Sequence, residues 1–349
     1  ITESDALRKN PLSYGPYVIK EIVQGEKVIF EANPYYYKGE PKIKRLEMEI
    51  LPPSQQVAAI KSGKYDIVLK VSPEIFPELE KLDNINILTK KAGSMNYIAF
   101  KLGKWDEEKN EVVTDPNSKM YDLNLRKAIA YAIDMDAVSK QFYHGLSTPA
   151  KSQLSPLFPS LHNPEINGYR IDIEKAKQLL DEAGYKDVDG DGIREGKDGK
   201  PIKFTFAMMS GGDIAEPLSQ YYLQQWKSIG LNVELVDGRL LDINNFYDRV
   251  EADDPAIDFC LAAIGFGSDP QQVSLFGKTA GFNISRYTSE TLDKALANTV
   301  SPEAIDDQKR AEFYKEYERV FMDEIPVVPQ LNKYEYLVVN KRVKMFDWT

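Results

Sequence analysis

The 349-residue chain contains one cysteine, two histidines and no surplus of basic residues. The single cysteine, Cys260, excludes an internal disulfide and any metal site built from several cysteines. It lies in an apolar run, which favours a small buried side chain over a nucleophile. The net charge of −10 argues against a nucleic-acid partner, whose phosphates attract Lys and Arg. No apolar run approaches the roughly 18 residues of a membrane span.

Motifs for catalysis are also absent. The sequence has no Gly-x-Ser-x-Gly elbow, no phosphate-binding loop, no His-Glu-x-x-His and no dinucleotide glycine fingerprint. His144 and His162 have no spaced His or Cys partner, so we expect surface or packing roles for both. Carboxylates are plentiful, and composition leaves open a hydrolase with two acids roughly 5–9 Å apart in a cleft.

Hydrophobic periodicity predicts an α/β protein of two lobes, joined near residues 91–97 and 322–332. A half-buried strand is expected over 42–51, with Leu46, Met48 and Ile50 on its inner face. Further strands are expected at 17–23, 28–31, 65–71, 93–100, 204–209, 232–236, 259–264 and 335–340. Helices are expected after Asp122, over 172–183 and 218–229, after Ser289, and from Ser301 and Pro302 onward.

The stretch 259–276 organises the rest of the chain. Its apolar start is typical of a strand buried on both faces, and it leads into the turn-forming residues 265–270. Asp269 therefore follows directly on a core strand, which is where open α/β sheets bind ligands. The alternative is that Asp269 and Pro270 only form a turn or a cap.

A second group of carboxylates lies in the loop 187–198. Acidic residues occupy positions 1, 3, 5, 9 and 12, with glycine at position 6, which is close to a twelve-residue Ca²⁺ loop. The predicted ligands are Asp187, Asp189, Asp191, Glu195 and Asp198. Such an ion would be structural; no other cofactor is expected. The alternative is a solvated acidic turn before the strand at 204–209, since no helix pattern follows as in an EF-hand.

Several segments, spread in order over nearly the whole chain, carry a family resemblance: residues 10–20, 31–37, 125–134, 174–185, 189–195, 266–270 and 281–287. Together they resemble the extracellular solute-binding proteins of family 5, the peptide-binding components of ABC importers, most closely those of Gram-positive bacteria.

The resemblance implies a two-lobed, periplasmic-binding-protein-like α/β fold (type II, cluster C-like) with mixed sheets. It implies part of lobe I at 1–92, lobe II at 93–319 and a return to lobe I at 320–349, with the N-terminal part of lobe I missing. It also implies a non-enzymatic, monomeric protein outside the cytoplasmic membrane, either a cell-surface lipoprotein with its N-terminal lipid anchor missing or periplasmic. Its partners would be an oligopeptide and the permease subunits of an ABC transporter.

In the peptide-binding relatives an aspartate after the core strand of the second lobe pairs with the α-amino group of the peptide. Asp269 matches that position, although many relatives read Asp-Tyr-Pro-Asp-Pro where this chain has only Ser-Asp-Pro. The ligand-binding residues implied are Asp269, Phe266, Gly267, Ser268, Asn96, Tyr97 and Asn283. Alternative ligands are a peptide pheromone, an oligosaccharide or a nickel chelate, and a further alternative is a calcium-stabilised interaction domain.

Overall fold

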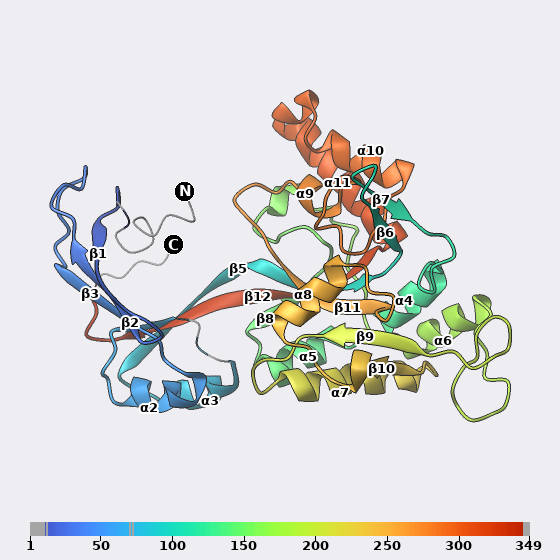
Figure 1. The fold of residues 1–349 in the computed structure, drawn as a ribbon, viewed down its shortest axis with the longest axis horizontal. Coiled ribbons are helices and arrows are strands. Elements are labelled where there is room, and N and C mark those ends of the chain that lie inside the picture. The colour runs from blue at the N-terminus through green and yellow to red at the C-terminus, as the bar shows by residue number, and fades with distance from the viewer. Residues whose placement is uncertain (1–10, 12, 70, 72, 345–349) are drawn as a thin grey trace. The chain divides into compact units, whose positions relative to one another are not determined.

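The computed structural model describes residues 11, 13–69, 71 and 73–344 (Figure 1). The chain divides by its internal contacts into two compact units, residues 1–66 and 67–349. This division does not coincide with the lobe boundaries expected at 92/93 and 319/320, which stay predictions. Residues 1–10 and 345–349, the ends of the expected lobe I segments, and Lys70, in the expected strand 65–71, lie outside the described residues.

The first unit contains a three-stranded antiparallel sheet in the order β1-β2-β3. Its strands are β1 (Tyr17–Val23), β2 (Lys27–Ala32) and β3 (Arg45–Glu49), and its helix is α2 (Gln56–Lys61). The strands expected at 17–23 and 28–31 are confirmed, and they form a hairpin: Gly25 takes a positive φ of 74° in the turn, and Glu26 N–H donates to Val23 O at 3.0 Å.

The burial expected for strand 42–51 is wrong. Leu46, Met48 and Ile50 are exposed, at 38%, 53% and 67% of their full surface. β3 is an edge strand of a small sheet, and one short α-helix among the described residues of this unit is too little to cover both faces. Alternation correctly predicted the strand, but neither face of the strand is buried.

The second unit is built around a seven-stranded mixed sheet with the strand order β10-β9-β11-β5-β12-β4, and β8 pairs with β12. Its strands are β4 (Ile67–Leu69), β5 (Ile85–Phe100), β8 (Ser147–Pro149), β9 (Phe204–Met208), β10 (Val233–Leu235), β11 (Phe259–Gly265) and β12 (Val327–Asn340). β10, β9 and β11 are parallel, whereas β5 is antiparallel to both β11 and β12. A separate hairpin joins β6 (Gly103–Asp106) to β7 (Glu111–Thr114).

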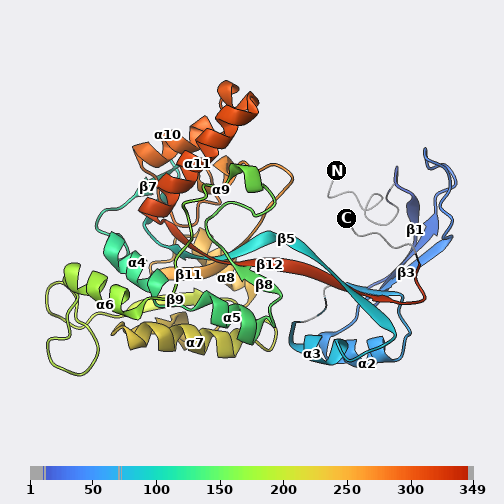
Figure 2. The same ribbon diagram turned by 180° about the vertical axis from the view of Figure 1, so that it is seen from behind.

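Helices cover both faces of this sheet. In Figure 2, α4 and α5 lie in front of it, whereas α8 lies on the opposite face, toward the viewer of Figure 1. The helices are α3 (Phe76–Leu79), α4 (Leu123–Tyr131), α5 (Met135–Phe142), α6 (Ile173–Glu182), α7 (Ala215–Ser228), α8 (Ile243–Glu251), α9 (Val273–Phe276), α10 (Glu290–Asn298) and α11 (Asp307–Glu324).

Side-chain caps set several of these helix starts. Asp122, Asp172 and Ser289 accept backbone N–H groups at the starts of α4, α6 and α10, as predicted. The expected start at Ser301 is wrong, because Pro302–Ile305 forms a separate 3₁₀ turn and Asp306 caps α11. Proline at the first turn fitted either kind of helix.

The two longest strands, β5 and β12, form a twisted antiparallel ribbon (Figure 1). The sequence indicated only the last half of β5 and the last half of β12. The register of the pairing between β5 and β12 shifts twice, between Pro329 and Leu331 and between Asn332 and Tyr334. Such bulges turn neighbouring side chains away from strict alternation.

Aromatic side chains fill the core beside the sheet. Phe206 of β9, Phe259 of β11 and Trp226 of α7 pack with ring centroids 5.0–5.1 Å apart. The indole N–H of Trp226 donates to Ile129 O at 3.2 Å and so ties α7 to α4. Cys260 is completely buried in β11, as predicted, and burial raises the pKa of its thiol to about 12.

Two groups of buried charges link distant segments. Asp253 accepts from Lys101 at 2.5 Å and from Arg286 at 2.7 Å, and its second oxygen accepts from Trp105 N–H at 2.7 Å. Burial opposes ionisation of Asp253, but the two cations outweigh it and leave its pKa below the usual value.

In the second group, Glu318 is fully buried in α11. It accepts from Ser152 Oγ, from Asn163 N–H at 2.5 Å and from His162 Nδ1 at 2.9 Å, while His162 Nε2 contacts Ser155 O at 3.0 Å. The hydrogen bond to Glu318 raises the pKa of His162, against the opposing effect of burial. His162 is therefore a packing residue, as expected.

This raised pKa predicts how stability depends on pH. Because the folded-state pKa of His162 lies above its unfolded value of about 6.5, its stabilising contribution is complete below about pH 6.5 and is lost as pH rises through the folded value. The free energy of unfolding, measured by denaturant titration from pH 5.5 to 9, should show this for the unaltered protein and lose it in His162→Gln. His144→Gln, at an exposed histidine, is the matched control. A pH-independent difference between the protein and His162→Gln would contradict the assignment.

Candidate functional site

The second unit has a cavity of about 440 Å³ where β5, β9, β11 and β12 meet the loop before α7. That volume suits a small ligand or one part of a larger ligand. Most of the wall is apolar and includes Leu146, Met208, Met209, Ile214, Leu218 and Leu261. The polar and charged groups include Glu74, Asn96, Tyr143, Lys333 and Tyr336.

Irregular backbone places these side chains. Gly211 and Gly212 have positive φ values of 131° and 68°, which let the chain leave β9 and turn into α7. On the opposite wall, the neighbours Lys333 and Tyr334 both line the cavity. A regular strand would point them to opposite faces, and the bulge in β12 accounts for the exception.

One end of the cavity carries polar atoms that lack partners. The Oε2 atom of Glu74 and the hydroxyl of Tyr336 are buried, and neither has a hydrogen-bond partner among the described residues. The Tyr336 ring packs edge-on against Phe76, with centroids 6.2 Å apart. Unpaired polar groups of this kind are rare in folded proteins and call for a physical explanation.

The electrostatics of the cavity follow from burial. Burial raises the pKa of Tyr143 to about 12; the Asn96 side chain opposes the shift and the Glu74 charge adds to it. Burial and then the Glu74 charge raise the pKa of Tyr336 still further. Burial lowers the pKa of Lys333. Both phenols are therefore neutral hydrogen-bond donors at physiological pH.

Among the predicted ligand-binding residues, Asn96 lines this cavity. Asp269 lies in the exposed turn that follows β11, where its Oδ1 accepts from Gln271 N–H at 3.0 Å. Neither Asp269 nor Phe266, Gly267 or Ser268 belongs to the cavity wall. The apolar strand and the turn after it are confirmed, and the role of this turn in binding stays a prediction.

Tyr97 and Asn283 lie inside the fold. Tyr97 is buried near Cys260 and Tyr247. The amide nitrogen of Asn283 donates to Phe276 O, Gly277 O and Tyr287 O at 2.9–3.4 Å, and its oxygen accepts from Ser285 Oγ. These bonds commit the Asn283 side chain to shaping its own loop.

Glu74 was not predicted from the sequence. An acid directly after proline and before an apolar run is typical of the first turn of a helix, and Glu74 does occupy the 3₁₀ turn before α3. The cavity residues Met208 and Tyr336 are more than a hundred residues away from Glu74 in sequence, so no local pattern marks it.

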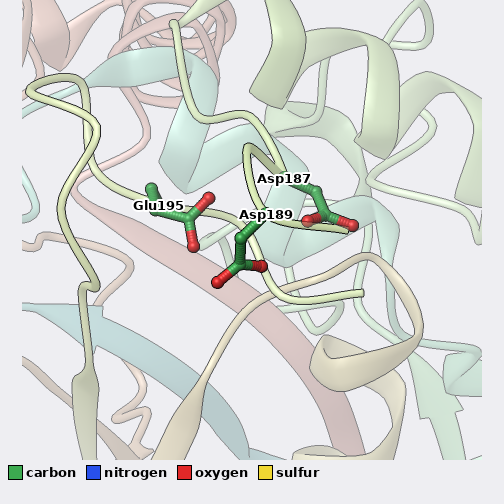
Figure 3. A group of neighbouring side chains, drawn as sticks. All are labelled: Asp187, Asp189 and Glu195. Atoms are coloured by element: carbon green, nitrogen blue, oxygen red, sulfur yellow. The ribbon is translucent and has the colours of Figure 1, made fainter. Parts of the chain in front are cut away.

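The predicted calcium loop brings together three of its five acids (Figure 3). Oxygens of Asp187, Asp189 and Glu195 lie within 4.8 Å of one another, and Glu195 is 6% exposed. Gly190 and Gly192 N–H groups donate to Asp187 at 2.7 and 3.0 Å, and Val188 N–H donates to Glu195 at 2.7 Å.

The other two predicted ligands lie outside this group. Asp191 accepts from Ile193 N–H at 2.7 Å. Asp198 accepts from Lys200 N–H and pairs with its ammonium at 3.3 Å, and these contacts hold the pKa of Asp198 below its usual value. Asp198 thus serves a neighbouring turn.

The chain belongs to the bacterial extracellular solute-binding proteins, family 5, which it matches over residues 2–283. It is 31% identical to the oligopeptide-binding protein OppA of Lactococcus lactis subsp. cremoris over 346 residues, covering 98% of this chain and 58% of that protein. It is 28% identical to the oligopeptide-binding protein AppA of Bacillus subtilis over 328 residues, covering 92% of this chain and 56% of that protein.

Solved structures agree with this family. Lactococcal OppA complexed with an endogenous peptide, in the closed conformation, superposes with a TM-score of 0.88 at 30% identity, covering 98% of this chain and 64% of that one. NikZ of Campylobacter jejuni in complex with Ni(L-His) gives a TM-score of 0.75 at 25% identity, covering 97% and 65%. The predicted family and mixed α/β fold class are confirmed, and the chain spans less than two thirds of the length of these relatives.

Proposed function

We propose that the protein captures oligopeptides outside the cytoplasmic membrane and passes them to the permease subunits of an ABC importer. The observation that carries this proposal is the likeness, over 98% of the chain, to OppA with a peptide bound. The proposal includes binding and release without covalent chemistry, a monomeric state and attachment to the membrane through a lipid anchor.

The physical features of the cavity support it. A peptide offers the same backbone groups whatever its sequence, and strand edges can pair with them. Pockets with mostly apolar walls and a few polar groups then hold its side chains. The cavity has this composition, and the flexible side chains of Met208 and Met209 can adapt to different shapes. No helix among the described residues is both long enough and apolar enough to span a bilayer.

The alternative functions gain less support. A hydrolase of this kind needs two acids that face each other, whereas Glu74 is the single acid among the described residues of the cavity wall. Direct nickel ligation would draw on histidine, but His162 is bound to Glu318 and Ser155, and neither His144 nor His162 lines the cavity.

Bound peptides should be detectable directly. Native mass spectrometry of protein purified from cells grown on peptide-rich medium should show heterogeneous additional masses of a few hundred daltons or more, which denaturation removes. Sequencing the released material by tandem mass spectrometry identifies it as peptide. A clean apo mass from such cultures would count against peptide capture.

Asp269 is proposed as the partner of the peptide α-amino group, because it is an exposed carboxylate directly after β11. Asp269→Ala should weaken binding of free-amine peptides about tenfold or more, since it removes a charge-assisted contact. N-acetylated peptides, which lack that charge, should bind both proteins equally in calorimetry. Asp306→Ala, at the cap of α11, controls for the loss of an acid elsewhere. Equal losses for both peptide types would contradict the role.

We also propose that the loop 187–198 binds a structural Ca²⁺ through Asp187, Asp189 and Glu195. Their oxygens lie within 4.8 Å of one another, which is the largest separation that two ligands can have around an ion with bonds of about 2.4 Å. Calcium should raise the melting temperature by a few degrees over EDTA-treated protein, and Asp187→Asn with Asp189→Asn should abolish that shift. Asp191→Asn is the matched control in the same loop. Identical melting with Ca²⁺ and EDTA would exclude the site.

A further inference from the structure

Glu74 is a half-buried residue with one buried carboxylate oxygen, and it differs from the acids of the two charged groups described above. Asp253 and Glu318 are each saturated by cations or hydrogen-bond donors. Glu74 forms no ion pair with a described residue, and its buried Oε2 accepts no hydrogen bond. A buried carboxylate oxygen without a hydrogen-bond partner costs free energy, so its place at the wall of a ligand cavity points to a ligand group as the partner.

The groups around Glu74 indicate the charge of the ligand group that pairs with it. The hydroxyl of Tyr336 is buried without a partner, and the charge of Glu74 acts on both Tyr336 and Tyr143. A cation could pair with the carboxylate and donate to the oxygen of Tyr336 at the same time. An anion would be repelled by Glu74, and a neutral group would leave its charge uncompensated.

The remaining walls indicate what carries the cation. Met208 and Met209 at the end of β9, Ile214 and Leu218 at the start of α7, and Leu146 are all apolar. Gly212 approaches the acid closely enough that a β-carbon there would stand 3.5 Å from Glu74 Oε1. A flexible aliphatic stem with a charged end fits such walls, because the stem contacts the apolar residues and the end reaches the acid.

Lys333 is the other charged residue of the cavity wall. Its ammonium forms no ion pair with a described carboxylate, Glu74 included, so it does not neutralise the acid. Burial lowers the pKa of its ammonium.

From this geometry we propose that Glu74, with Tyr336, binds an ammonium or guanidinium group on an aliphatic stem, that is, a lysine or arginine side chain of the bound peptide. This inference rests on the proposed function and deepens it. It assigns to the protein a preference for peptides with a basic residue at one position, separate from any recognition of the α-amino group.

The test uses alanine pentapeptides that carry lysine at each position in turn, and matched peptides with norleucine, which keeps the stem but lacks the charge. Calorimetry should find one position where lysine binds at least about tenfold tighter than norleucine. Glu74→Gln should abolish that difference, and Tyr336→Phe should reduce it. Glu80→Gln, an exposed acid that does not line the cavity, should preserve it.

Each outcome has a distinct meaning. If norleucine peptides bind and lysine gives no advantage at any position, or if Glu74→Gln keeps the advantage, the inference is overturned while peptide binding stands. If Glu74→Gln instead removes a preference for free over N-acetylated termini, the cation is the α-amino group and the side-chain assignment is overturned. If none of the peptides binds, the proposed function fails as well.

Folding of the variant is checked separately. Because Glu74→Gln removes an uncompensated charge, the ligand-free variant should be at least as resistant to denaturant as the unaltered protein. A marked loss of stability would show that Glu74 has a partner within the fold, and would itself overturn the proposal.

Discussion

The pairing of β5 with β12 is the constraint on which the rest of the second unit depends. The two strands pair antiparallel from Ile85 opposite Asn340 to Ala99 opposite Val327, with two register shifts between these ends. One side of the ribbon pairs with β11, and the other with β4 and β8. Its bulges break the alternation of side chains where the cavity forms. The ribbon therefore gives both the continuity of the sheet and the irregular wall that a ligand needs.

Asp253 and Glu318 have a different role from Glu74. Asp253 joins Lys101, directly after β5, and Trp105 of β6 to the loop that carries Arg286. Glu318 joins α11 to the segment 152–163, and each acid has its charge balanced locally. Removing one partner from such a group typically costs about 3–5 kcal/mol, since a buried charge is left alone. Glu74 has no such balance and does not hold segments together. Among the described residues, Glu74 and Asp293 each have a buried carboxylate oxygen without a hydrogen-bond partner. Of these two acids only Glu74 lines the cavity, where we propose that a ligand group pairs with it.

Many elements of the fold could be predicted from the sequence, and the features that could not be predicted have physical causes. Caps at Asp122, Asp172 and Ser289 are local signals, so the helices after them were predictable. β12 was seen only in part because Pro329 resembles a break, although a bulge accommodates it. The burial of β3 depends on what covers the sheet, which alternation cannot reveal. The cavity is assembled from residues as distant as Glu74 and Tyr336, and no spacing rule joins them.

The burial of Cys260 makes its thiol a probe for transient opening of the central sheet. Its thiol lies at the centre of β11, with no exposed surface and a pKa of about 12, so reagents cannot reach it and little thiolate forms. As the only cysteine in the chain, it gives an unambiguous chemical signal. Its labelling rate reports how often the central sheet opens, and cysteines introduced on the surface can carry probes without competition from it.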